Sequence, residues 1–230
     1  MKNLIFWFNR LIDLLKYPIA FLLFISLPFL LPKLFQIIEI IIRYKEHYYP
    51  FFIGMGVYIV IWKIIFKDIG SGWFSTLEHE LTHILFAVVT FHKITDLKAS
   101  FTGNGHIQYS GAGGGNWMIT ISPYFFPTFP ALVLGLMYLS KNQFNMFFLG
   151  LLGFSIFYHI HSTYRETHYG QSDLKEIGFS YAWFFLPSAN ISVLVVLLAL
   201  IPNDKIYLQI VINKFYEYHL SYINIFIDNF

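Results

Sequence analysis

Long apolar runs separated by short polar breaks are the feature that most constrains how this chain can fold. The sequence divides into about six such segments, each close to the ~20 residues that a helix needs to cross the hydrocarbon of a bilayer. They lie at residues 17–42, 48–66, 71–91, 117–139, 144–161 and 177–201. Because a spanning helix satisfies its own backbone hydrogen bonds, these runs predict an α-helical polytopic membrane protein with about six transmembrane helices.

The composition favours a membrane protein over a soluble domain with a large core. Of the 230 residues, 57% are hydrophobic and only 12% are charged, whereas soluble domains carry about 25% charged residues. The net charge of +2 and the scattered basic residues argue against nucleic acid as a partner. The chain has no cysteine, so His, Asp and Glu are the side chains available to bind a metal ion.

The two ends of the chain differ from residues 17–201, which we expect to form one membrane-embedded domain. Residues 1–16 mix charged and aromatic side chains and have no signal-peptide cleavage site, so we expect an amphipathic helix at the membrane interface. Residues 202–230 have a similar mixture and predict an amphipathic tail. Lys and Arg are nearly balanced on the two sides of this arrangement, so the sequence does not predict its orientation.

One stretch between the third and fourth segments has the alternation of β-strands. Apolar and polar residues alternate over residues 97–102 and again over 106–110, on either side of Gly103-Asn104-Gly105. This pattern predicts a small β-hairpin. Such a hairpin could pair with an unwound substrate strand, or it could simply cap the membrane domain.

The fourth segment contains Pro123, Pro127 and Pro130. Proline removes a backbone donor and clashes with the preceding turn, so it distorts a helix at membrane depth. The sequence is equally compatible with a bent wall beside a functional site and with a kinked helix that has only a structural role.

The third segment carries His79-Glu80-Leu81-Thr82-His83, an HExxH pentapeptide, near its middle. Residues four apart share one face of a helix, so both imidazoles can reach one metal ion while Glu80 reaches a water bound to it. A zinc ion with an open coordination position lowers the pKa of bound water to about 7. Glu80 can then take a proton from that water as it attacks a carbonyl. A purely structural helix is the alternative, but ionisable groups within a membrane segment usually have a function.

A catalytic zinc ion needs a third protein ligand, with the fourth position left to water. The candidates lie between the end of the fifth segment and the start of the sixth: His159, His161, Glu166, His168 and Asp173. The spacing of these residues does not decide among them.

The combination of motifs resembles the site-2-protease class of intramembrane zinc metalloproteases, the M50 type. The features that carry the resemblance are the pentapeptide in a membrane segment, the glycine-bearing hairpin after it, the Ser-Pro-Tyr sequence at 122–124 and the late Asp173. The resemblance covers roughly residues 71–178, and the pentapeptide is its most specific part. It implies zinc ligands at His79, His83 and the late aspartate.

In that class the glutamate of the pentapeptide is the general base, which implies this role for Glu80. The class usually presents its aspartate in an Asn-Pro…Asp-Gly context, whereas the residues from Gln171 to Leu174 here are Gln-Ser-Asp-Leu. His159 is therefore an alternative ligand or, like Gln171, a residue that orients a ligand. Asp173 could instead cap the helix that follows it.

We expect from these features a membrane-embedded zinc metalloprotease that hydrolyses peptide bonds of membrane-associated proteins or peptides. The resemblance and the small size suggest a bacterial cytoplasmic membrane, with several passes through the bilayer. A metal-binding transporter or scaffold without proteolytic activity is the main alternative, because polar groups at mid-membrane also mark transport pathways. An amidase that acts on soluble substrates with the same zinc chemistry is a third possibility.

Overall fold

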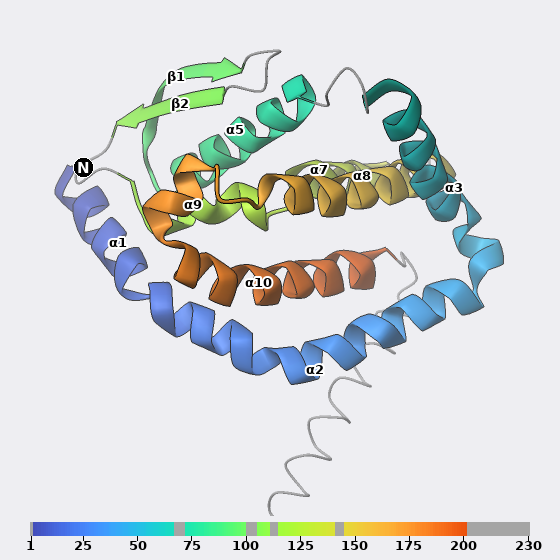
Figure 1. The fold of residues 1–230 in the computed structure, drawn as a ribbon. Coiled ribbons are helices and arrows are strands. Elements are labelled where there is room, and N and C mark those ends of the chain that lie inside the picture. The colour runs from blue at the N-terminus through green and yellow to red at the C-terminus, as the bar shows by residue number, and fades with distance from the viewer. Residues whose placement is uncertain (1, 67–71, 100–104, 111–114, 141–144, 202–230) are drawn as a thin grey trace, which may run out of the picture.

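A computed structural model gives the fold, which is mostly helical (Figure 1). It describes residues 2–66, 72–99, 105–110, 115–140 and 145–201. The α-helices are α1 (Lys2–Leu14), α2 (Lys16–Arg43), α3 (Lys45–Ile61), α5 (Gly72–Val89), α6 (Trp117–Ile121), α7 (Thr128–Leu139), α8 (Asn145–Glu166), α9 (Ser172–Ile177) and α10 (Phe179–Leu200). The other elements are the π-helical turn η1 (Trp62–Phe66), the 3-10 turn η2 (Ser122–Tyr124) and the strands β1 (Lys93–Ala99) and β2 (Gly105–Ser110).

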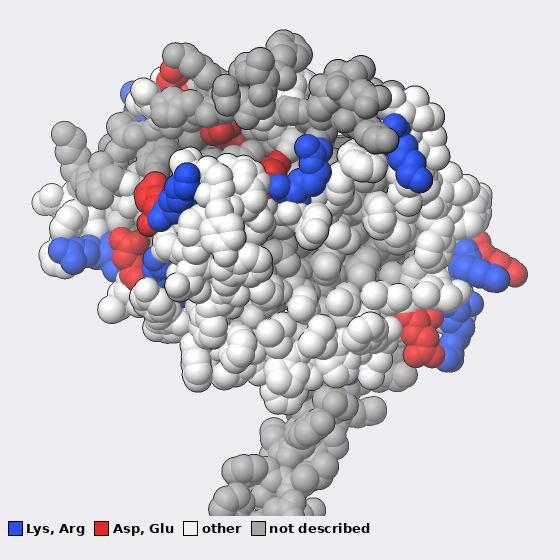
Figure 2. Space-filling model, in the orientation of Figure 1, with Lys and Arg blue, Asp and Glu red and all other residues white. Residues whose placement is uncertain are grey.

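Three of the helices in the described part of the chain, α2, α8 and α10, are long and apolar enough to cross a membrane. The stretches Trp117–Tyr124 and Thr128–Leu139 pass the same test together, as one span broken by a bend of 79°. Figure 2 shows a broad surface without charged side chains, and the charged ones lie at its margins. The chain is an integral membrane protein. The number of six spans stays a prediction, because α3 and α5 do not meet the test.

Helices α7, α8 and α10 lie in the middle of the molecule, with α2 packed against α10 and α3 packed against α8 (Figure 1). One buried apolar cluster joins these five helices, with members Ile37, Phe51, Val133, Leu152 and Leu198. A second cluster joins α1, α2, α9 and α10 to the turn η2 and contains Tyr124 and Leu174. This second cluster holds α9 and η2 against the start of α10. The candidate site lies beside α9 and η2.

The backbones of α3 and α8 touch at glycines. A Cβ atom on Gly54 would overlap the carbonyl oxygen of Gly150 and lie 2.7 Å from its carbonyl carbon. A Cβ atom on Gly153 would overlap the carbonyl oxygen of Phe51 in the same way. Small residues allow this approach, which is common between helices in membranes. It fixes the position of α8 relative to α3.

The strands β1 and β2 pair in antiparallel fashion, from Lys93 opposite Ser110 to Ala99 opposite Gly105. Both strands contact α5, and Figure 1 shows them beside that helix. The pairing therefore begins four residues before the alternating pattern that starts at Leu97. The turn of the predicted hairpin lies outside the described residues, as does the predicted tail at 202–230.

The predicted fourth segment is broken rather than continuous. The 3-10 turn η2 ends at Tyr124, and α7 begins at Thr128 after Pro127. Proline has no N–H to continue a helical ladder, which explains the break. The turn η2 contacts α5, so the break brings Tyr124 beside the helix that carries the pentapeptide.

The predicted sixth segment is also divided. The short helix α9 is separated from α10 by Gly178, whose φ of 92° and ψ of 124° are accessible to glycine but strained for other residues. Helix α8 runs on to Glu166, beyond the predicted end at His161. The chain then turns back through α9, which brings Asp173 toward α5 (Figure 1).

Candidate metal centre

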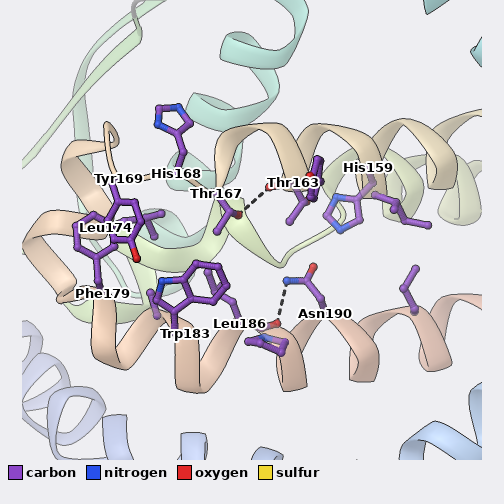
Figure 3. A pocket seen from close by; sticks show the side chains of 15 residues that line it. His159, Thr163, Thr167, His168, Tyr169, Leu174, Phe179, Trp183, Leu186 and Asn190 are labelled. Atoms are coloured by element: carbon purple, nitrogen blue, oxygen red, sulfur yellow. Dashed lines mark hydrogen bonds between the residues drawn. The ribbon is translucent and has the colours of Figure 1, made fainter.

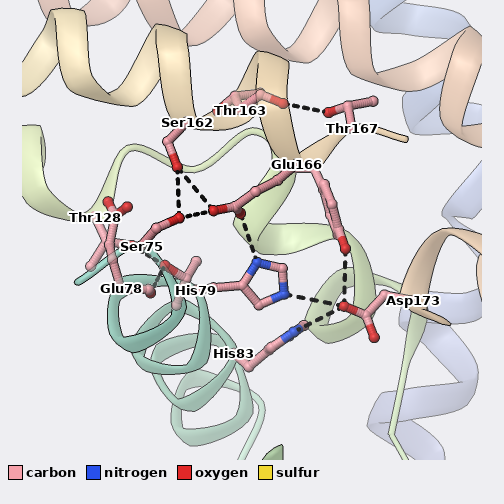
Figure 4. A network of polar contacts seen from close by, with 12 residues as sticks. Ser75, Glu78, His79, His83, Thr128, Ser162, Thr163, Glu166, Thr167 and Asp173 are labelled. Carbon is pink, nitrogen blue, oxygen red and sulfur yellow. Dashed lines mark hydrogen bonds and ion pairs between the residues drawn. The ribbon is translucent and has the colours of Figure 1, made fainter. Parts of the chain in front are cut away.

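Helix α5 presents His79 and His83 on one face, as the spacing of four residues predicts. Their ring centroids are 4.9 Å apart. Asp173 reaches the same point from α9, and one ligand atom from each of the three residues lies within 4.8 Å of the other two. Figure 4 shows the three side chains pointing toward one another.

The Asp173 carboxylate lies between the two histidines. Its Oδ2 atom is 3.2 Å from Nε2 of His79 and 3.4 Å from Nε2 of His83. The buried Tyr124 donates its hydroxyl hydrogen to the same oxygen over 3.2 Å. The turn η2 thus also holds the aspartate.

The outer ring nitrogens of both histidines are held as hydrogen-bond donors. His83 Nδ1 lies 2.8 Å from the carbonyl oxygen of Ile119, and His79 Nδ1 lies 3.0 Å from Oε2 of Glu166. A carbonyl and a carboxylate can only accept, so each Nδ1 carries the hydrogen. In a neutral imidazole the other nitrogen, Nε2, then has a lone pair. Two lone pairs therefore face an anionic oxygen, an arrangement that a cation between them stabilises.

The two distances from the Asp173 oxygen fit a zinc ion. Zinc binds histidine nitrogen and carboxylate oxygen at about 2.0–2.2 Å, so adjacent ligands of a tetrahedral site lie about 3.3–3.6 Å apart. The separations of 3.2 and 3.4 Å between the Asp173 oxygen and the two nitrogens are close to this range. Three protein ligands with one open position is the pattern of catalytic zinc sites.

Asp173 has the charge that such a site needs. Burial by itself raises the pKa of this carboxyl group, but when the two imidazoles are protonated, His79 and His83 outweigh burial through their hydrogen bonds and positive charges and hold the pKa well below its usual range. The group is therefore ionised at neutral pH.

Glu80 is 6% exposed and lies next to His79 on α5. The Tyr124 phenol experiences the charge of Glu80 together with the charges of Asp173 and Glu166. Glu80 therefore belongs to the same polar interior as the candidate ligands.

Glu166 anchors a network between α5 and α8. Its Oε1 atom accepts hydrogen bonds from Ser75 and, over 3.0 Å, from Ser162. The two serine hydroxyls lie 3.2 Å apart. Sequence reasoning treated Glu166 only as a candidate ligand and missed both serines. The signal was a spacing of four residues, because Ser75 precedes His79 by four and Ser162 precedes Glu166 by four.

Polar contacts also join α5 to the start of α7. Glu78 Oε1 accepts a hydrogen bond from the backbone N–H of Phe129 over 3.1 Å, and Thr82 contacts the hydroxyl of Thr128. The first N–H groups of a helix have no partner within the helix. Glu78 supplies one, and this contact fixes the bent span beside the candidate site.

The structure places His159 away from the cluster. It lies on α8 two turns before Glu166, about 10 Å along the helix axis. Its imidazole lines a pocket of about 440 Å³ between α8 and α10, together with Trp183 and Asn190 (Figure 3). Its Nε2 atom is buried and has no hydrogen-bond partner among the described residues.

The remaining sequence candidates also lie outside the cluster of three. His161 Nδ1 is 2.6 Å from the hydroxyl of Tyr58 on α3, and His168 accepts a hydrogen bond from the N–H of Gly170. Gln171 accepts a backbone hydrogen bond from the N–H of Lys175 at the start of α9. Among the candidates for the third ligand, Asp173 is the one that the described structure brings to the pentapeptide.

Comparison with known proteins identifies the family. No curated protein and no solved structure matches the chain. A family model described as Peptidase M50B-like matches residues 51–202, which is more than half of the chain. The matched region contains the pentapeptide, both strands and Asp173, and it confirms the resemblance that these motifs indicated. The chain therefore belongs to the Peptidase M50B-like family.

Proposed function

We propose that this protein is a membrane-embedded zinc metalloprotease that hydrolyses peptide bonds of membrane-associated substrates. The observation that carries the proposal is the convergence of His79 Nε2, His83 Nε2 and Asp173 Oδ2 while each outer ring nitrogen is engaged as a donor. Membership of the Peptidase M50B-like family supports the same reaction. A multi-pass location in a bacterial cytoplasmic membrane is part of the proposal.

Each side chain of the centre has a role in this proposal. His79, His83 and Asp173 would hold the zinc ion. When bound, zinc acts as a Lewis acid and lowers the pKa of a coordinated water. Glu80 would accept the proton of the attacking water and later give it to the leaving amine. Tyr124 keeps the aspartate oxygen turned toward the two imidazoles by its hydrogen bond.

The substrate would reach this centre as an extended strand. A helical peptide shields its amide groups with its own hydrogen bonds, so a membrane helix must unwind before it is cut. An exposed sheet edge can hold an unwound peptide by backbone pairing. The pair β1 and β2 contacts α5, which carries Glu80, and this position beside the centre supports such a role.

The decisive experiment compares wild-type protein with Glu80→Gln and with Glu176→Gln, a matched change at an exposed carboxylate of α9. Each purified protein is assayed for bound zinc and incubated with a panel of single-span peptides. We expect about one zinc ion in all three and cleavage by the wild type and by Glu176→Gln only.

Other outcomes separate the alternatives. Bound zinc without cleavage in any of the proteins would favour a metal-binding transporter or scaffold. Cleavage of soluble amides but not of membrane peptides would favour an amidase. Cleavage that persists in Glu80→Gln would contradict the role of Glu80 as the general base.

A further inference from the structure

Glu166, the last residue of α8, contacts the histidine that opens the pentapeptide. Its Oε2 atom is 3.0 Å from Nδ1 of His79, and the opposite ring nitrogen faces Asp173 (Figure 4). We propose that Glu166 is a positioning residue: it selects the tautomer of His79 in which Nε2 has the lone pair, and it fixes the direction of that lone pair. This inference rests on the proposed function, because it assumes that His79 binds a metal ion.

The tautomer matters because only one of the two neutral forms can bind a metal at this point. A histidine with its hydrogen on Nε2 would direct a donor, rather than a lone pair, at the shared position beside Asp173. The carboxylate of Glu166 cannot donate, so it stabilises the form with the hydrogen on Nδ1. A carboxylate on the outer nitrogen of a ligating histidine also raises the basicity of the inner one.

Glu166 is itself held in place through its other oxygen. Ser75 and Ser162 both donate to Oε1, which leaves Oε2 to His79. The side chains of Glu166 and His79 are 20% and 11% exposed, so water competes little for their hydrogen bond. The carboxylate is thus fixed from two helices before it orients the ring.

The two histidines differ in how their outer nitrogens are held. His83 donates to a backbone carbonyl, that of Ile119, which side-chain substitution leaves in place. His79 depends on a side chain that can be replaced. Glu166 is not itself in the cluster of candidate ligands, because the oxygen that faces His79 meets the ring on its outer side. Replacement of Glu166 should therefore change how His79 binds metal without removing a ligand.

The test measures zinc affinity rather than peptidase activity. Wild type, Glu166→Gln, Glu166→Ala and His79→Ala are purified in detergent, with Glu176→Gln as the matched control. Dissociation constants come from competition with a chelator, and visible spectra of Co²⁺-loaded protein report the ligand geometry. The melting temperature of each metal-free protein reports any structural role. Loss of a carboxylate behind a ligating histidine weakens metal binding by about 10–100-fold.

We expect Glu166→Gln to weaken zinc binding about tenfold and Glu166→Ala about a hundredfold, because the amide oxygen of glutamine is a neutral acceptor and alanine offers none. The Co²⁺ spectrum should change in both variants. Glu176→Gln should match the wild type. The metal-free melting temperature of Glu166→Gln should stay at the wild-type value, because the amide NH2 of glutamine can donate to the serine hydroxyls while its oxygen faces His79.

Three results would overturn these conclusions in different ways. If the wild type binds zinc and both Glu166 variants bind it equally well, Glu166 has no positioning role and the metal centre stands. If zinc affinity and the metal-free melting temperature fall together in Glu166→Gln, the residue acts on the fold. If the wild type binds no more zinc than His79→Ala does, the metal centre and the proposed function are both wrong.

Discussion

The close contact between α3 and α8 predicts that Gly54→Ala lowers the stability of the protein, because there is no room for a methyl group at this position. The new Cβ atom would lie 2.7 Å from the carbonyl carbon of Gly150, while ordinary contacts begin at 3.4 Å. The carbonyl oxygen of Gly150 lies closer still, so the two helices must separate by more than about 0.7 Å, since the obstacle is backbone on both sides. Overpacking of this kind costs about 1–3 kcal/mol.

The cost should appear as a lower melting temperature. For a chain of this size each kcal/mol corresponds to about 2–4 °C, so we expect a fall of roughly 2–12 °C for Gly54→Ala. Gly56→Ala is the matched control on the same helix, because a Cβ atom on Gly56 meets nothing within 4 Å. Thermal unfolding of both variants in the same detergent, followed by circular dichroism, makes the comparison.

The same displacement should reach the metal centre through α8. Glu166 lies on α8, and its hydrogen bond to His79 is 3.0 Å long. A displacement of α8 along the direction of this bond lengthens and weakens it. Zinc affinity should therefore fall in Gly54→Ala and not in Gly56→Ala. Equal melting temperatures for the two variants would refute the argument from close packing.

Two further pairs of substitutions test the candidate site. Asp173→Ala should abolish stoichiometric zinc binding, because it removes one of the three candidate ligands. His159→Ala should leave the zinc content unchanged, because His159 faces the pocket between α8 and α10. The reverse result would make His159 the ligand. Tyr124→Phe removes the donor to Asp173 and should weaken zinc binding by about 10–150-fold, since a hydrogen bond to a charged group contributes about 1.5–3 kcal/mol. Tyr138→Phe is the matched control, because it removes an exposed hydroxyl that donates to the carbonyl of Leu200. Zinc affinity is measured by the same chelator competition. Equal zinc affinities for Tyr124→Phe and Tyr138→Phe would count against the Tyr124 contact.

Local periodicity explains why part of the site was predictable. The relation between His79 and His83 depends only on the pitch of one helix, so the spacing of four residues was sufficient. The alternation of apolar and polar residues also predicted that β1 pairs with β2. The pairing extends back to Lys93, before the alternation begins, because a strand's extent depends on its partner strand as well as on its own sequence. The sequence also shows that Ser75 and Ser162 each lie four residues before a site residue. It does not show that both serines donate to Glu166.

Local sequence patterns did not predict the contacts between segments that are distant in the sequence. Five residues were candidates for the third ligand, and no spacing rule relates them to a helix about 80 residues earlier. The break at Pro127 and the positive φ of Gly178 redirect the chain, so that η2 contacts α5 and Asp173 of α9 reaches the histidines of α5. Prolines predicted that the fourth segment would be distorted, but not that the distortion would bring Tyr124 to Asp173.

The sequence by itself determined the membrane setting, the helical class and a pentapeptide whose two histidines share one face of a helix, because hydropathy and helical periodicity are properties of neighbouring residues. Only the tertiary structure decided that Asp173, rather than His159, completes the cluster and that Glu166 lies behind His79. Both results depend on where the end of α8 and the short helix α9 place their side chains relative to α5. This packing depends on burial and on backbone turns in many parts of the chain. A pattern of neighbouring residues does not contain that information.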